Sequence, residues 1–139
     1  MKKVFITDYF NEAKIEKEVF GKSVDVICLN KKNKNDFLKK IEDADGLLVW
    51  HYNINKNVIE KLKNCRGIVR YGVGCDNIDL SSARKFNIDC ANTPDYGIDE
   101  VADTALAMLL SLLRKVPKYN QNCKYYKTGW QENVLKENI

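Results

Sequence analysis

Proline and glycine are scarce in this chain of 139 residues, which contains two prolines and seven glycines. They stand singly or in short turns, so no segment has the composition of a flexible linker, a low-complexity tract or a disordered tail. No internal repeat is visible. The length, with 45% hydrophobic and 30% charged residues, is that of one ordinary globular domain, and we expect a folded chain with its own core.

Long apolar runs and disulfide patterns are lacking too. The longest apolar run, Ala105 to Leu113, is interrupted by Ser111 and is far shorter than the about 20 residues of a membrane span. The stretch from Met1 to Asp8 has too short an apolar part for a signal peptide. The five cysteines have no C-x-x-C spacing and are odd in number, which favours reduced thiols over a disulfide frame or a zinc site. These features predict a soluble cytoplasmic protein without a membrane or metal partner.

Positive charge is in small excess, with 23 Lys and Arg against 19 Asp and Glu and a net charge of +4. Apart from the run Lys31, Lys32 and Lys34, the lysines are scattered over polar helix faces. A nucleic-acid-binding protein would show a clustered basic stripe with base-stacking aromatic residues. We therefore interpret the charge as a solvated surface and expect no nucleic-acid partner.

Short apolar runs alternate with amphipathic segments as far as about Asn92, which is typical of a parallel sheet covered by helices. The predicted strands are Val4–Thr7, Val24–Leu29, Gly46–Trp50, Gly67–Tyr71 and Ile88–Ala91. The predicted helices between them are Glu12–Phe20, Asp36–Glu42, Lys56–Leu62 and Leu80–Phe86, with Asn35 and Asn55 placed as N-caps. Because the connections are short, the crossovers are right-handed. The predicted fold class is α/β, a flavodoxin-like doubly wound parallel five-stranded sheet followed by a long apolar helix.

Ligands of such sheets bind at the carboxyl ends of the strands. The residues placed there are Asp8, His51, the turn from Tyr71 to Asn77 and the turn from Asn92 to Gly97. His51 is the only histidine, and its pKa range suits a general base near neutral pH. The alternative is a partly exposed loop histidine without a chemical role.

The turn after the fourth predicted strand is the most informative segment. Gly72 and Gly74 resemble the start of a dinucleotide fingerprint, but the third glycine of Gly-x-Gly-x-x-Gly would fall at Asn77, so that interpretation fails. What remains is a glycine-rich turn whose backbone N–H groups can approach a small anion, with Arg70 able to add a forked charged hydrogen bond. A carboxylate is the natural ligand. The alternative is a tight turn with Arg70 on the surface and Asp79 capping the next helix.

A helix is predicted from Ile98 to Val116. Asp99 and Glu100 favour its N-terminus, and basic residues stand near its other end. Apolar side chains cover most of its circumference, so such a helix must be buried nearly all round. We expect a second domain or a partner chain to complete this burial, and we expect Pro117 to supply the bend after the helix.

The run from Arg70 to Asp79 resembles the NAD-dependent D-2-hydroxyacid dehydrogenases in residue types and in their spacing. Asn92-Thr93-Pro94 and the stretch from Asp99 to Leu106 resemble that family in the same way. With Trp50-His51, the run is most similar to the branch that includes the C-terminal-binding-protein corepressors, and D-3-phosphoglycerate dehydrogenases are near relatives. The resemblance covers essentially the whole chain and is specific from about residue 68 to residue 113.

The resemblance implies two parts. Residues 1–94 would be the substrate-binding domain, and residues 95–139 would be a linker helix and an arm of an NAD-binding domain. In the family, the arm, here Lys127-x-Gly129-Trp130, leads to a Gly-x-Gly-x-x-Gly loop that holds the cofactor pyrophosphate. The catalytic arginine, its acidic partner and the histidine base follow that loop, so none maps onto this chain, and we expect the 139-residue chain alone to be inactive. Family members pair through the cofactor domain, which implies a homodimer through the helix from Ile98 to Val116.

The resemblance also implies roles for single residues. Gly74 and Arg70 would bind the carboxylate of a 2-oxoacid or 2-hydroxyacid, and His51 would line the substrate pocket without matching the catalytic histidine. Val73 would touch NAD through its main chain, since valine lacks the hydroxyl that some members carry there, and Val101 would lie near the cofactor. The identity of the hydroxyacid and the choice between NAD and NADP stay open.

Two other classes of function share this arrangement of strands and helices. A stand-alone, non-catalytic ligand-binding or interaction module with the same fold remains the alternative. A signalling receiver module shares the βα order but needs an acidic pair after the first strand, an aspartate after the third and a lysine after the fifth. This chain has Asp8 alone, then Trp50-His51, then Asn92-Thr93-Pro94, so the receiver interpretation is rejected.

Overall fold

The computed structural model of the chain describes residues 1–8, 10–30 and 38–125. One parallel sheet has the strand order β2-β1-β3-β4-β5, which is the flavodoxin-type order. The strands are β1 (Lys2–Ile6), β2 (Val24–Cys28), β3 (Gly46–Val49), β4 (Gly67–Arg70) and β5 (Asp89–Ala91). The predicted α/β fold class with a five-stranded parallel sheet is confirmed.

The first four predicted strands ran one residue too far at their carboxyl ends. Thr7, Leu29 and Tyr71 each donate one last backbone hydrogen bond to a neighbouring strand, at 2.8–3.0 Å, and then leave the sheet. Trp50 does not, because its N–H donates to the Asp8 carboxylate. The carboxyl edge is therefore shaped by side-chain contacts that an apolar pattern does not reveal.

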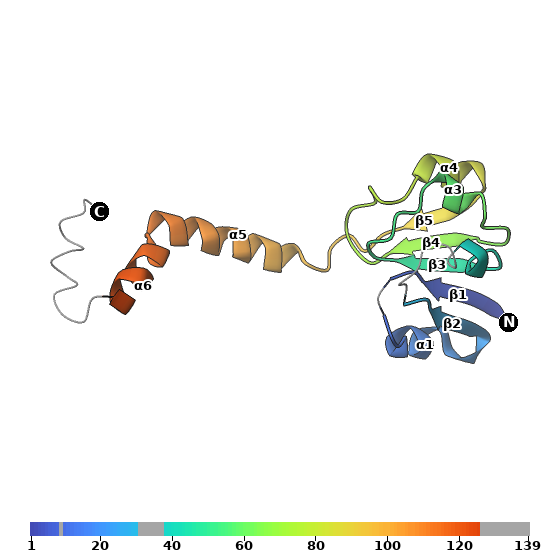
Figure 1. Cartoon of the computed structure of the whole chain (residues 1–139), viewed down its shortest axis with the longest axis horizontal. Coiled ribbons are helices and arrows are strands. Elements are labelled where there is room, and N and C mark those ends of the chain that lie inside the picture. Colours follow the sequence, from blue (N-terminus) through green and yellow to red (C-terminus); the bar gives the residue numbers. More distant parts are fainter. Residues whose placement is uncertain (9, 31–37, 126–139) are drawn as a thin grey trace. The chain divides into compact units, whose positions relative to one another are not determined.

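Helices cover both faces of the sheet (Figure 1). Alternate side chains of a strand point to opposite faces, and the core is divided accordingly. Leu47 belongs to the cluster that includes Val58 of α3 (Lys56–Ile59) and Ala83 of α4 (Leu80–Lys85). Leu48 belongs to the cluster that includes Ala13, which directly precedes α1 (Lys14–Phe20), and Val26. The sheet is thus doubly wound, as predicted.

Helix boundaries follow local hydrogen bonding. Asn55 caps α3 by accepting from the Val58 N–H at 3.2 Å, as predicted, and Asp79 caps α4 by accepting from the Ser82 N–H at 2.9 Å. Helix α3 ends before the predicted Leu62 because the Leu62 N–H donates to Ile59, three residues back, which tightens the turn. Residues 38–40 are helical, whereas the predicted cap at Asn35 lies outside the described residues.

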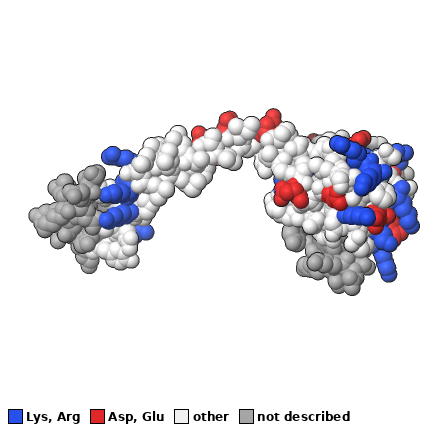
Figure 2. Space-filling model, turned by 90° about the horizontal axis from the view of Figure 1, so that it is seen from above, with Lys and Arg blue, Asp and Glu red and all other residues white. Residues whose placement is uncertain are grey.

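The chain divides into two compact units, residues 1–95 and 96–139. The second contains α5 (Ile98–Leu113) and α6 (Val116–Tyr125). Figure 2 shows an uncharged surface along α5, between the acidic residues near its start and the basic residues that follow its end. Among the described residues, no helix combines the length and the apolar character that crossing a membrane requires.

The predicted helix from Ile98 to Val116 extends too far at its C-terminal end. Helix α5 stops at Leu113, and Lys115 has a positive φ of 52°, the left-handed conformation that ends many helices. The expected bend at Pro117 is also wrong. Pro117 is the second residue of α6, in the first turn, where the missing N–H removes no intrahelical hydrogen bond.

Candidate functional site

The loops after β1, β3 and β4 leave neighbouring strands at the same edge of the sheet (Figure 1). They carry Asp8, the Trp50–Tyr52 loop and the turn from Tyr71 to Asn77. The structure therefore brings together three of the places that the sequence marked as strand ends, and the loop after β5 lies beside them because β5 pairs with β4.

Asp8 is 4% exposed, and its carboxylate is committed to the neighbouring loop. Its oxygens accept from the N–H groups of Trp50 at 2.7 Å, His51 at 2.7 Å and Tyr52 at 3.1 Å. The Thr7 hydroxyl adds a fourth hydrogen bond at 2.7 Å. A buried carboxylate is tolerated only when its oxygens are satisfied in this way, so the network fixes both Asp8 and the loop backbone.

Asn77 holds the same loop from the other side. Its Nδ2 donates to the carbonyl oxygens of Trp50 at 3.2 Å and Tyr52 at 3.0 Å. Just beyond, Ile54 and Ile78 form a parallel bridge, with the Ile54 N–H donating to the Asn77 carbonyl at 2.8 Å. The loop after β3 and the turn after β4 thus form one bonded unit.

The glycine turn is anchored from the loop after β5. Asn92 donates through Nδ2 to the Val73 carbonyl at 2.7 Å, and the Thr93 N–H donates to the Gly72 carbonyl at 3.2 Å. These contacts engage the carbonyl groups of the turn but not its N–H groups. Within the described part of the chain, the backbone N–H groups of Gly72, Val73 and Gly74 have no acceptor. Successive free N–H groups make an anion-binding concavity.

Arg70 lies against this turn. A Cβ at Gly72 would be 1.6 Å from its Nη1 and 2.6 Å from its Cζ, so only glycine lets the guanidinium lie there. The Arg70 Nε is buried and has no hydrogen-bond partner among the described residues. A buried donor without an acceptor is costly, and an anionic ligand at the turn would remove that cost.

An aromatic group lines the edge on the side of α1. The ring centroid of Phe10 lies 5.9 Å from that of Trp50 and 5.7 Å from that of Tyr71. The Tyr71 hydroxyl donates to Glu16 of α1 at 2.6 Å. Burial raises the pKa of Tyr71, and the hydrogen bond to Glu16 raises it further. Tyr71 therefore remains a neutral donor at physiological pH.

Two predicted site residues are exposed. The His51 ring stacks on Trp50 with centroids 4.4 Å apart, and among the described residues no carboxylate hydrogen-bonds to its ring nitrogens. This geometry suits a contact surface better than a general base, whose ring a third group normally orients. Val101 is an exposed residue in the first turn of α5, in the second compact unit.

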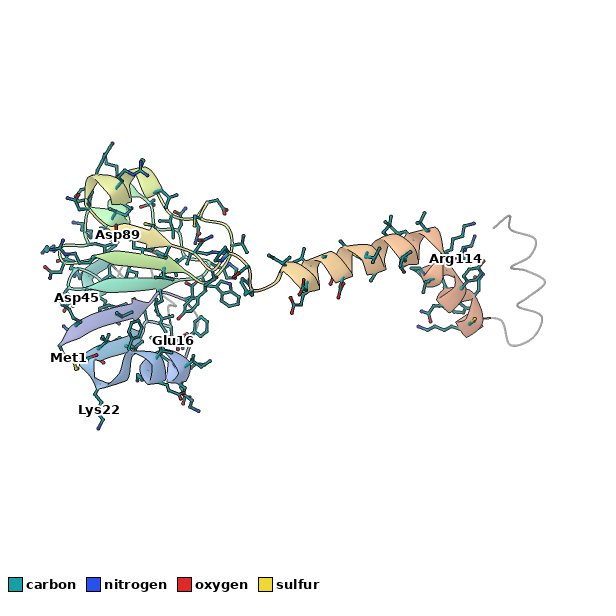
Figure 3. All side chains as sticks on the ribbon, turned by 180° about the vertical axis from the view of Figure 1, so that it is seen from behind. Met1, Glu16, Lys22, Asp45, Asp89 and Arg114 are labelled. Atoms are coloured by element: carbon teal, nitrogen blue, oxygen red, sulfur yellow. The ribbon has the colours of Figure 1, made fainter. Side chains whose placement is uncertain are left out.

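An open hollow of about 840 Å³ lies at the opposite, amino edge of the sheet, where Met1 and Asp45 are labelled in Figure 3. Its lysines are already paired, Lys2 with Asp45 at 2.6 Å and Lys63 with Glu42 at 2.9 Å, and Arg66, which also lines it, is exposed to solvent. The described residues contain no group of three or more potential metal ligands. The unpaired donors at the carboxyl edge therefore define the candidate site.

Sequence reasoning identified Arg70, Gly74 and His51 but gave Asp8 and Asn77 no role. Asp8 was marked only as a strand end, and Asn77 only as part of a turn. Their partners are 42–44 and 25–27 residues away in sequence, so no local spacing reveals them. The one available signal was the position of Asp8, directly after a strand at the ligand-binding edge.

Fold and site together define an α/β domain whose carboxyl sheet edge carries a glycine turn with unpaired backbone N–H groups and an unpaired arginine donor. Residues 4–137 match the family described as D-isomer specific 2-hydroxyacid dehydrogenase, catalytic domain. The chain belongs to this family, as its sequence predicted.

Individual relatives agree with this assignment. The chain is 36% identical over 124 residues to a glyoxylate reductase of Pyrococcus horikoshii, covering 84% of this chain and 35% of that protein. It is 32% identical over 125 residues to a D-3-phosphoglycerate dehydrogenase of Methanocaldococcus jannaschii, covering 89% and 24%. The chain thus spans about a quarter to a third of the length of these relatives.

The solved structures show the same fold. The NAD⁺-bound 3-phosphoglycerate dehydrogenase of Entamoeba histolytica matches with a TM-score of 0.68 and 28% identity, covering 79% of this chain and 38% of that one. The resemblance therefore holds in sequence and in three dimensions.

Proposed function

We propose that this chain is the substrate-docking part of an NAD-dependent oxidoreductase that interconverts a D-2-hydroxyacid and a 2-oxoacid by hydride transfer. The observation that carries the proposal is the buried, unpaired Arg70 Nε beside the free N–H groups of Gly72, Val73 and Gly74. Membership of the family supplies the reaction class.

The turn suits a carboxylate for electrostatic reasons. The Arg70 guanidinium lies against Gly72 and offers charged donors, and the N–H groups of Gly72, Val73 and Gly74 offer neutral donors along the same turn. Charge-assisted hydrogen bonds are shorter and stronger than neutral ones. A planar carboxylate can accept from both sets at once, which would orient the carbon next to it for reaction.

The cofactor would meet this chain at the margin of the same turn. Val73 is 54% exposed and its carbonyl accepts from Asn92, so the N–H and the methyl groups of Val73 are available for contact. Val101, exposed on α5, is the second proposed contact. NAD would accept or donate the hydride, while the residues of this chain bind and orient the acid. These features fit a cofactor boundary, not a pyrophosphate site.

His51 is proposed as a wall of the substrate pocket. Its ring is exposed and stacked on Trp50, and its backbone belongs to the loop that Asn77 ties to the glycine turn. A stacked pair of rings offers apolar area to the side chain of the acid, on the far side from its carboxylate.

We also propose that residues 1–94 are the substrate-binding domain and that residues 95–139 belong to the cofactor-binding part. The exposed leucines of α5 would then form a homodimer interface. All five cysteines are free thiols, which supports a reducing, cytoplasmic location.

Titration of the 139-residue chain with pyruvate, followed by nuclear magnetic resonance, tests the carboxylate site. The Gly74 amide and the Arg70 Nε–H signals should shift with pyruvate and stay in place with uncharged pyruvamide. Arg70→Ala should weaken binding by about 1.5–3 kcal/mol, the range for a charged hydrogen bond. Arg66→Ala, which removes an exposed arginine lining the hollow at the amino edge, is the matched control. Equal pyruvate affinity in Arg70→Ala and in the unmodified chain, or an unchanged KM of the full-length enzyme, would contradict the proposed role.

A further inference from the structure

The backbone of the loop after β3 is held by side chains from two other loops. Asp8 takes up the N–H groups of three consecutive residues, Trp50 to Tyr52, and Asn77 takes up the carbonyl groups of the first and the last. Loop backbone groups at a sheet edge usually bind water. A buried carboxylate and a carboxamide from two other loops replace that water here.

The Asn77 carboxamide is committed to this purpose. With Nδ2 directed at two carbonyl oxygens, its Oδ1 is buried and accepts no hydrogen bond within the described residues. The opposite orientation would place Oδ1 against the same two carbonyl oxygens, which repel it. Asn77 therefore gives up an acceptor to hold the loop.

The held loop presents two side chains outward. Trp50 and His51 are exposed and stacked on each other, and Phe10 packs on Trp50 from the loop after β1. Asn77 also belongs to the turn that carries Gly72 and Gly74. The Asn77 amide thus ties the backbone that carries the Trp50 and His51 rings to the glycine turn.

We propose that Asp8 and Asn77 are positioning residues that fix the Trp50–His51 wall against the glycine turn, so that the site selects 2-oxoacids with a flat or apolar side chain. The proposal rests on the proposed function, because the turn must first bind the carboxylate. The carboxylate orients the acid, and the wall then contacts whatever extends from its 3-carbon. A loosened loop would keep the first interaction and lose the second.

The test compares two 2-oxoacids on the same 139-residue chain. Dissociation constants for pyruvate and phenylpyruvate are measured for the unmodified chain, Asp8→Asn and Asn77→Ala. Asn77→Ala serves as the second variant because Asn77 is only half-buried, so its replacement disturbs the core less. Amide hydrogen exchange of residues 50–52 reports the loop directly. Asp79→Asn is the matched control, since Asp79 also accepts a backbone N–H but at the start of α4.

In the unmodified chain, phenylpyruvate should bind more tightly than pyruvate. Both variants should speed exchange at residues 50–52 by about 10-fold or more, because local opening becomes easier. They should raise the dissociation constant of phenylpyruvate about fivefold, the scale of an aromatic contact. The dissociation constant of pyruvate should stay within about twofold of its value in the unmodified chain. Asp79→Asn should leave both affinities unchanged, and it should not speed exchange at residues 50–52 beyond the effect of its lower global stability.

Faster exchange with both affinities unchanged would overturn the proposal, because the clamp would then serve stability alone. An equal loss of affinity for both acids would overturn it as well, since that result indicates a general loosening of the site. Tighter binding of pyruvate than of phenylpyruvate by the unmodified chain would contradict the wall while leaving the carboxylate site intact. Binding of neither acid would refute the proposed function itself, and the positioning role with it.

Discussion

Gly72 shows how one residue without a side chain shapes this site. The Arg70 guanidinium occupies the space where a Cβ would stand, 1.6 Å from Nη1. The sequence indicated that the turn needed glycine, but it suggested backbone access to a ligand as the reason. The structure adds a second reason, which is room for the arginine.

We therefore predict that Gly72→Ala displaces the guanidinium and weakens pyruvate binding by about 10-fold or more, the equivalent of one charged hydrogen bond. Gly97→Ala is the matched control, because no atom lies within 4 Å of its added Cβ and Gly97 has a negative φ of −130°. Calorimetric titration of both variants measures the effect. An unchanged affinity in Gly72→Ala would show that Arg70 does not bind the carboxylate.

Asp79 links stability to pH. Hydrogen bonds from Ser82, first from its N–H and then from its hydroxyl, with a further one from the Ser81 hydroxyl, lower the pKa of Asp79 to about 2. The pKa in the unfolded chain is about 3.9. A lowered folded pKa means that the contribution is fully present above about pH 4 and is lost as the pH falls toward about 2.

Asp79→Asn should therefore unfold at a lower denaturant concentration than the unmodified chain at pH 6, and this difference should shrink between about pH 4 and pH 2. The control is Asp89→Asn, since the exposed Asp89 carboxylate accepts no hydrogen bond within the described residues. Denaturation curves across this pH range provide the measurement. A difference that stays constant with pH would contradict the assigned role.

Residue by residue, the sequence predicted what depends on near neighbours. The caps at Asn55 and Asp79 act on residues three positions ahead, so local spacing was enough. The Asp8 and Asn77 contacts join loops that only the folded sheet brings together. Tertiary proximity of this kind has no signature in local composition or period.

At the level of elements, strand order and helix placement followed from the alternating pattern, while element ends did not. The clearest case is the junction of α5 and α6. The apolar pattern continues to Val116, but the helix stops earlier because Lys115 adopts a left-handed conformation with φ of 52°. Lysine has a Cβ that makes this conformation unfavourable.

Replacing Lys115 by glycine should consequently raise the free energy of unfolding by about 1 kcal/mol, because glycine adopts positive φ without a steric cost. Gln121→Gly, in the interior of α6, is the control and should lower it by about 1 kcal/mol. Thermal denaturation followed by helical circular dichroism tests both changes. A destabilised Lys115→Gly would indicate that other contacts of Lys115 outweigh its backbone conformation.

For the whole molecule, the sequence predicts an apolar helix that must be buried but does not show what covers it. In the structure, α5 exposes Leu106, Leu109, Leu110 and Leu113, each between 50% and 67% accessible. Each leucine left in water forgoes about 1.5–3 kcal/mol of burial. A surface of this kind on a folded unit marks an interaction site, and a two-fold axis lets one helix cover the same helix of a second copy.

We accordingly predict that the chain forms a dimer or larger species at micromolar concentration, with α5 at the interface. Sedimentation analysis should give a mass at least twice 16.0 kDa. The double variant Leu109→Lys and Leu113→Lys should shift the equilibrium to the monomer, because an interface centred on these leucines would have to bury two like charges from each copy. Val19→Lys, which alters an even more exposed apolar residue of α1, is the control and should leave the dimer intact. A monomer at all concentrations, or an assembly that Val19→Lys disrupts and the leucine variant does not, would show that α5 is not the interface.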